Sequence, residues 1–232
     1  MAGMGYYSGR VSEVRLEVGR HMEAHIACPV GAIPRAGQYL LASSLDDPLE
    51  ALGVPLFIAG NSEGGFWAAP PIPPAWGPGT NLDLVGPLGH GFDLPRQVQS
   101  LGLAALGETV SRLMPLVRQT SASHAGMTLF TDLALPQIPA SLEAYPLVSL
   151  AEALDWPDFM VFDLPLTRLS ELRKILSLPN GAGLPCPAQV LVTTPMPCAG
   201  LAGCGACAVP ARRSWKLACE DGPVFDLSLL KW

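Results

Sequence analysis

Four of the six cysteines in this 232-residue chain stand near its C-terminal end, at Cys198, Cys204, Cys207 and Cys219. Their spacing is C-x5-C-x2-C-x11-C. Three thiols on a Gly- and Ala-rich loop, with a fourth returning after a short excursion, could hold one metal cluster. A plant-type [2Fe–2S] site uses C-x4-C-x2-C and a more distant cysteine. The pattern here differs from that one by a single additional residue in the first gap.

A four-cysteine zinc site is the main alternative to an iron–sulfur cluster. Structural zinc sites usually combine two C-x2-C pairs, and only Cys204 and Cys207 form such a pair here. Cys28 and Cys186 are interpreted as ordinary buried or half-buried thiols. The histidines are dispersed and are not expected to be ligands: His21, His25, His90 and His124.

The residues between the cysteines also favour a cluster. Gly200, Gly203 and Gly205 permit backbone angles that other residues resist, and could bring N–H groups toward the sulfurs. Such contacts raise the reduction potential of a cluster. We expect neighbouring apolar residues to exclude water from it: Pro197, Leu201, Ala202 and Ala206.

Charge and hydropathy restrict the partners and the compartment. The net charge of −6, with no Lys/Arg cluster, argues against nucleic acid as a partner. No basic and apolar leader opens the chain, and no apolar run approaches the length of a membrane span. We therefore expect a cytoplasmic protein that does not contact a membrane. Disulfides are not expected there, because thiols stay reduced.

The elements that must position the cysteines divide into two kinds. The first part of the chain has short alternating strands and frequent Gly and Pro, which number 24 each in the whole sequence. Six such strands without a good helix predict a small antiparallel barrel. They are expected at 10–18, 21–28, 37–41, 54–59, 65–69 and 81–85.

From about residue 95 onward, strands alternate with helices, which predicts a Rossmann-like α/β unit with a parallel sheet. Strands are predicted at 127–132, 159–162 and 189–193, and helices at 101–119, 147–154 and 166–178. Ser149 and Thr167 are the expected N-caps of the last two helices, and Pro115 is expected to kink or end the first. The predicted domains are a barrel at 1–94, a degenerate nucleotide-binding-like domain at 95–194 and a cluster-binding segment at 195–232.

Three stretches carry a resemblance to a known family. Met196 shortly precedes the first cysteine, and Cys219 is followed by the acidic-Gly-Pro-Val-Phe run of 220–225. The stretch 86–92 reads GPLGHGF, and 37–39 reads GQY. Together they resemble the electron-transfer subunit of the two-subunit, NAD-linked dihydroorotate dehydrogenase, within the ferredoxin-reductase superfamily. The resemblance implies a [2Fe–2S] cluster with Cys198, Cys204, Cys207 and Cys219 as ligands.

The nucleotide-binding motifs of that family are eroded here. Its Arg-Pro-x-Ser segment, which holds FAD, corresponds to 54–57, where Val54 and Phe57 replace Arg and Ser. Its GGG-x-G loop corresponds to 101–107, which has no glycine run, and its Cys-Gly-Pro corresponds to 163–165, Asp-Leu-Pro. FAD is implied by the resemblance, but no FAD-binding, NAD-binding or catalytic residue is assigned.

The prediction is a [2Fe–2S] electron-transfer subunit of an oxidoreductase complex. The resemblance implies a flavin-containing catalytic subunit, similar to dihydroorotate dehydrogenase of pyrimidine biosynthesis, as partner in a hetero-oligomer. Two alternatives stay open: a flavin-free iron–sulfur adaptor of another oxidoreductase, and a zinc-stabilised interaction module.

Overall fold

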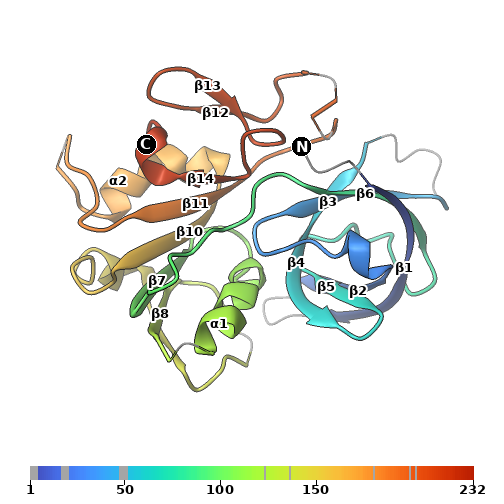
Figure 1. The fold of residues 1–232 in the computed structure, drawn as a ribbon, viewed down its shortest axis with the longest axis horizontal. Helices are drawn as coiled ribbons and strands as arrows, with labels where there is room; N and C mark the ends of the chain where they lie inside the picture. The colour runs from blue at the N-terminus through green and yellow to red at the C-terminus, as the bar shows by residue number, and fades with distance from the viewer. Residues whose placement is uncertain are drawn as a thin grey trace.

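The computed structural model describes residues 5–16, 21–46, 52–122, 124–135, 137–179, 181–198, 200–201 and 203–232. It contains a barrel and a layered sheet unit side by side, with the C-terminal segment lying over their junction (Figure 1). The predicted fold class is confirmed: an antiparallel barrel is followed by an α/β unit and a C-terminal cysteine loop. Among the described residues, no helix is long and apolar enough to cross a bilayer.

The barrel is closed by six antiparallel strands in the order β1-β2-β5-β4-β3-β6. Their bounds are β1 Gly5–Leu16, β2 Met22–Ala27, β3 Tyr39–Ser44, β4 Val54–Ser62, β5 Gly65–Ala68 and β6 Asn81–Leu88, with a short 3-10 helix, η1, at Val30–Ala32. The strands form because apolar residues alternate with polar ones. In β6, for example, Leu82 and Leu84 are buried while Asn81 and Asp83 are exposed. The last residues of the strand predicted at 10–18 lie outside the described residues.

The second unit is a six-stranded sheet in the order β14-β11-β10-β7-β8-β9. Its strands are β7 Ser100–Ala105, β8 Gly126–Phe130, β9 Leu142–Tyr145, β10 Phe159–Pro165, β11 Ala188–Thr193 and β14 Val224–Asp226. All pairs are parallel except β11 with β14. The central β10 is buried over its first six residues, as expected for a strand covered on both faces.

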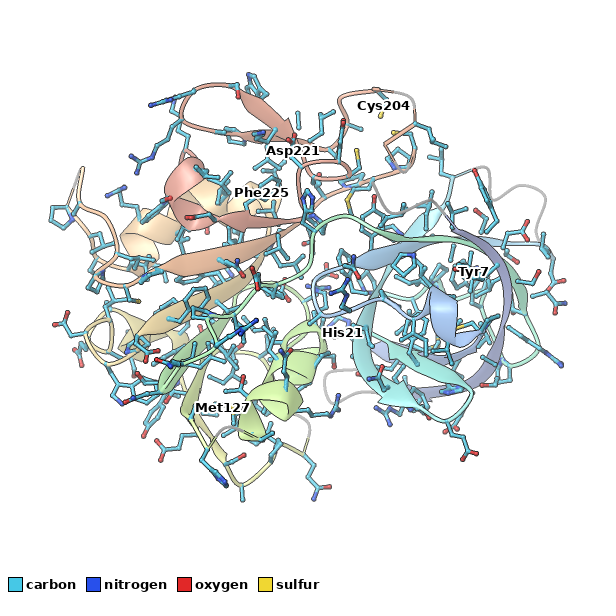
Figure 2. The ribbon with its side chains drawn as sticks, viewed as in Figure 1. Tyr7, His21, Met127, Cys204, Asp221 and Phe225 are labelled. Atoms are coloured by element: carbon cyan, nitrogen blue, oxygen red, sulfur yellow. The ribbon has the colours of Figure 1, made fainter. Side chains whose placement is uncertain are left out.

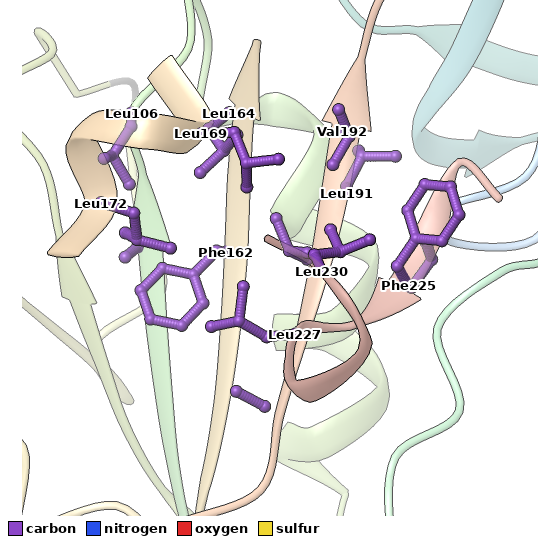
Figure 3. Close-up of a cluster of buried hydrophobic side chains, with 14 of the residues drawn as sticks. Leu106, Phe162, Leu164, Leu169, Leu172, Leu191, Val192, Phe225, Leu227 and Leu230 are labelled. Atoms are coloured by element: carbon purple, nitrogen blue, oxygen red, sulfur yellow. The ribbon is translucent and has the colours of Figure 1, made fainter. Parts of the chain in front are cut away.

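Helices and the chain end cover the sheet. They are η2 Ser111–Leu113, α1 Met114–Ser121, η3 Leu147–Leu150, η4 Leu166–Glu171, α2 Leu172–Ile175 and η5 Leu227–Leu229. Figure 3 shows one apolar layer, in which Phe162 and Leu191 of the sheet lie near Leu227 and Leu230 of the chain end. This layer joins the C-terminal segment to the sheet.

The predicted helix at 101–119 is wrong in its first part, which is strand β7. Leu101–Ala105 are all buried, and a short, wholly apolar run cannot be assigned to helix or strand by periodicity alone. The α-helix begins at Met114, and Pro115 lies in its first turn instead of ending it. Proline is tolerated there because the first N–H groups of a helix have no intrahelical partner.

The other two predicted helices are shorter than expected and mostly of 3-10 type. The predicted caps at Ser149 and Thr167 are wrong. The helices begin after Pro146 and Pro165, whose extended backbone sets the entry without a side-chain cap. Strands β9 and β14, and the hairpin of β12 (Ala208–Pro210) and β13 (Trp215–Leu217), are additions to the predicted elements. The barrel ends at Leu88 and the sheet begins at Ser100, while the domain division at residue 94 stays a prediction.

Candidate metal centre

The cysteine loop is fixed at both ends by strands of the sheet. Strand β11 leads into it through Met196, which is almost fully buried, and β14 leaves it through Val224 and Phe225, which are also buried. The loop lies above the junction of barrel and sheet, with Cys204 at the outer edge of the molecule (Figure 2). Sheet and loop are therefore held together by apolar packing on both sides of the cysteines.

The four predicted ligands are brought together as two pairs of thiols. The Sγ atoms of Cys198 and Cys204 lie 3.6 Å apart, and those of Cys207 and Cys219 lie 3.1 Å apart. Neither pair is a disulfide, since that bond requires an S–S distance of about 2.05 Å. Two sulfurs on one tetrahedral metal, with bonds of about 2.3 Å, lie roughly 3.8 Å apart. The Cys198–Cys204 pair has nearly this spacing, and the Cys207–Cys219 pair is closer than two ligands on one metal ion.

The pairs are not gathered into a single mononuclear site. Over the part of the chain that the structure describes, no group of three or more His, Cys, Asp or Glu is arranged to hold one metal ion. The arrangement of two and two matches the needs of a two-metal cluster, in which each iron takes two protein ligands.

The two pairs differ in burial. Cys207 and Cys219 are buried, whereas Cys198 is half-buried and Cys204 is exposed. Burial, and then the neighbouring Cys207 thiol, raise the pKa of the Cys219 thiol to about 12. Because the thiolate is the form that binds metal, loading this site must displace a firmly held proton.

The glycines of the loop are required by the backbone. Gly203 and Gly205 have φ values of 55° and 74°, a left-handed region that side chains disfavour. A Cβ atom at either position would meet no heavy atom within 4 Å, so lack of space is not the reason.

The water exclusion predicted for this loop is wrong for two of its residues. Leu201 and Ala206 are exposed, Pro197 is half-buried, and Ala202 lies outside the described residues. Water is excluded from the inner pair by other buried residues: Met196, Val209 and Ala218. The burial of the inner pair therefore comes from long-range packing.

Tyr39 is a site residue that the sequence indicates only through a weak GQY match. Its ring is fully buried, and its hydroxyl donates to the Cys219 carbonyl at 3.4 Å. Burial, followed by the charges of Cys219, Cys207 and Cys198, raises the pKa of Tyr39 well above its usual value, which keeps the hydroxyl protonated. The barrel thus contacts the inner cysteine pair directly.

The GPLGHGF stretch also packs against the loop. The His90 backbone N–H donates to the Gly222 carbonyl at 2.6 Å, and its Nδ1 lies 3.1 Å from the Asp221 carbonyl. The Asp221 carboxylate accepts from Lys216 Nζ at 2.7 Å and from the Leu217 N–H at 2.8 Å. Burial alone would raise the pKa of Asp221, but these donors outweigh it and lower the pKa. The turn after the fourth cysteine is therefore held from both sides.

The three eroded nucleotide motifs converge on one cavity. It has a volume of about 420 Å³ and lies between β4 and the carboxyl ends of β7, β10 and β11. Val54 and Phe57 line one side, and Gly107 and Pro165 line the other. In open α/β sheets, ligands bind at this end of the strands. The three motif positions, which are far apart in the sequence, therefore line a single cavity in the folded chain.

Comparison with known proteins identifies the C-terminal segment. Residues 195–231 match the family model described as the iron-sulfur cluster binding domain of dihydroorotate dehydrogenase B. The predicted resemblance is confirmed. This iron–sulfur domain match begins at Pro195 and includes all four cysteines of the loop. No curated protein matches the sequence.

Solved structures support the fold over the whole chain. An NADH-dependent reduced ferredoxin–NADP oxidoreductase, studied for flavin-based electron bifurcation, matches with a TM-score of 0.73 and 19% identity, over 100% of this chain and 92% of its own. The ferredoxin reductase of carbazole 1,9a-dioxygenase, in its FAD apo form, matches with a TM-score of 0.59 and 18% identity, over 76% and 65%. Phthalate dioxygenase reductase, a modular structure for electron transfer from pyridine nucleotides to [2Fe–2S], matches with a TM-score of 0.55 and 12% identity. The match covers 89% of this chain and 72% of that reductase. At these identities the likeness establishes a ferredoxin-reductase-like fold.

Proposed function

We propose that this chain is a [2Fe–2S] electron-transfer subunit that relays electrons to or from a flavin-containing oxidoreductase. The observation that carries the proposal is the pairing of its thiols, 3.6 Å and 3.1 Å apart, inside a segment that matches an iron–sulfur domain model. Cys198 and Cys204 would hold one iron, and Cys207 and Cys219 the other. A bound cluster of this kind supplies one-electron transfer.

The protein residues have separate tasks in this scheme. The buried pair, Cys207 and Cys219, anchors the site to the body of the chain, and Tyr39 fixes the Cys219 backbone from the barrel. The outer pair lies toward solvent at Cys204. Electrons can therefore enter or leave at the outer edge without a change in the fold, and the chain needs no acid or base residue for that step.

The partner follows from the family of the matched segment. A domain described as part of dihydroorotate dehydrogenase B supports a hetero-oligomer with a catalytic subunit similar to dihydroorotate dehydrogenase. Exposed Leu201, beside the outer cysteines, offers an apolar contact to such a partner. A reducing compartment such as the cytoplasm would keep the four thiols available for iron.

The test is anaerobic purification, with and without the products of neighbouring genes, followed by iron, acid-labile sulfide and zinc analysis. We expect about two irons and two sulfides per chain, thiolate-to-iron absorption, and a paramagnetic signal after reduction. Zinc without sulfide would refute the proposal and establish the zinc-stabilised module. Cys28→Ser and Cys186→Ser are matched controls that should leave the iron content unchanged.

A further inference from the structure

Several side chains join the barrel to the sheet unit, among them Ser111, Arg118 and Arg112, and Arg112 is the one that lines the cavity of the eroded motifs and bonds to both units. It follows β7 in η2 and is only 3% exposed. Its Nε donates to Asp163 Oδ2 of β10 at 2.9 Å, and its Nη1 donates to the Pro70 carbonyl of the barrel at 2.8 Å. The guanidinium also lies 5.9 Å from the centre of the Phe57 ring on β4. Arg112 therefore contacts both units from within their interface.

Arg112 occupies the space that a dinucleotide needs after the first parallel strand. In dinucleotide-binding folds, glycines in this turn let the pyrophosphate approach the backbone. Here a Cβ atom on Gly107 would lie 2.8 Å from Arg112 Nη2. The group that lies close to the Gly107 backbone is therefore the Arg112 guanidinium, in the position that a pyrophosphate would take. The next residue, Glu108, adds an exposed carboxylate to the same cavity wall. A carboxylate there repels phosphate.

Arg112 is also not free to bind a phosphate. Asp163 is fully buried, and its Oδ1 has no hydrogen-bond partner in the described part of the chain. Withdrawing Arg112 would remove the partner of Oδ2 as well. A buried carboxyl group without a partner is strongly unfavourable.

The remaining cavity is mostly apolar. Pro55, Phe57, Pro71 and Pro165 line it, and Val54 stands where the family motif carries arginine. Among the described residues that line this cavity, Arg112 is the one cationic side chain, and it is already committed to Asp163 and Pro70.

We propose that this cavity binds neither FAD nor a nicotinamide dinucleotide, and that Arg112 joins the barrel and the sheet at the place where dinucleotide-binding folds hold their cofactor. The cluster is then the redox centre that this chain contributes, and any flavin of the complex belongs to the partner. This inference rests on the interface and not on the cysteine loop.

The first experiment measures cofactor binding by the full, cluster-loaded chain. Flavin released by denaturation is quantified by fluorescence, and FAD and NADH are titrated by calorimetry. We expect no stoichiometric flavin and no saturable heat for either ligand. Stoichiometric FAD, or saturable binding of either dinucleotide, overturns the proposal. Iron and sulfide are counted in the same sample. Bound dinucleotide would overturn the present proposal, whereas missing iron and sulfide would overturn the proposed electron-transfer function, so the two failures are distinguishable.

The second experiment measures the joining role of Arg112. Arg96 is exposed on the segment between β6 and β7, where trypsin can cut if the two units separate. We expect Arg112→Met to accelerate cleavage after Arg96 by roughly tenfold or more, because separation of the two units releases the backbone around Arg96 so that it can enter the protease. Protection equal to that of the native chain would contradict the joining role.

A matched control uses another arginine that donates to a backbone carbonyl. Arg168 Nη1 donates to the Leu106 carbonyl at 2.8 Å, and its Nε pairs with Glu171, so its partners lie within the sheet unit. Arg168→Met should leave cleavage after Arg96 unchanged. If Arg112→Met does not fold, the double variant Arg112→Met/Asp163→Leu removes both polar partners, and it should fold but still be cleaved faster.

Discussion

The hydroxyl of Tyr39 donates a hydrogen bond to the backbone carbonyl of Cys219 across 3.4 Å, although the two residues are 180 positions apart. The first belongs to the barrel and the second to the C-terminal loop. Because both are buried, this contact fixes the inner half of the cysteine site against a rigid strand. It explains how a loop with little regular structure can hold its inner ligands in place.

Replacing Tyr39 by Phe tests that relationship. The ring remains, but the Cys219 carbonyl loses its donor, which should lower the free energy of unfolding by about 1 kcal/mol. The cluster should still assemble, with a shifted midpoint potential, because backbone position around the sulfurs tunes the metal. Denaturant unfolding and a redox titration measure the two effects. Tyr6→Phe, an exposed tyrosine, is the control, and a Tyr39→Phe chain with unchanged stability and potential would rule out the fixing role.

The cysteines should separate into ligands and bystanders. We expect Cys207→Ser to abolish cluster assembly, because it removes one of the two thiols of the buried pair. Cys28→Ser should retain full iron and sulfide. Burial raises the pKa of the Cys28 thiol to about 11, so it is a poor source of thiolate. Iron and sulfide analysis gives the result, and loss of cluster from Cys28→Ser would contradict the ligand assignment.

The loop glycines should control how firmly a cluster is held. Gly205→Ala places a side chain at a φ of 74°, which costs about 1–2 kcal/mol. Cluster loss to an iron chelator, followed by absorption, should therefore be faster than in the native chain. Gly183→Ala is the control, since that glycine has equally open surroundings and no left-handed φ. Equal rates for the two variants would show that backbone strain at Gly205 is unimportant.

Asp163 should make stability depend on pH in an unusual direction. Burial raises the pKa of Asp163, and the contact with the charged Arg112 side chain lowers it. Burial is the larger effect, so the pKa of Asp163 is raised. The native state therefore keeps a proton that the unfolded chain loses near pH ~3.9. The resulting stabilisation is complete below that pH and is lost as pH rises through the folded pKa.

This pH dependence can be isolated by subtraction. Urea unfolding of the native chain and of Asp163→Asn at a series of pH values gives two stability curves, and their difference should fall with rising pH. The other carboxylates contribute equally to both curves and cancel. A difference that rises with pH would mean that the Arg112 ion pair, and not burial, dominates the pKa.

The sequence by itself determined the features that depend on local pattern. Alternating residues between Gly and Pro turns predict the six barrel strands, and the spacing of the cysteines with their flanking residues predicts the iron–sulfur segment. These features can be predicted from the sequence because the residues that form them are close together in the chain, on one face of a strand or in one loop. Leu101–Ala105 have no such signal, since a wholly buried strand lacks alternation, and the helix predicted there is wrong for that reason.

Only the tertiary structure decided how distant residues combine. Spacing cannot show that Cys207 pairs with Cys219 and not with the nearer Cys204. It also cannot show that Tyr39 reaches the cysteine loop, or that Arg112 meets Asp163, 51 positions away, beside the cavity that the eroded motifs line. Those contacts depend on how the barrel and the sheet pack, and packing is set by apolar surfaces that have no fixed separation along the chain.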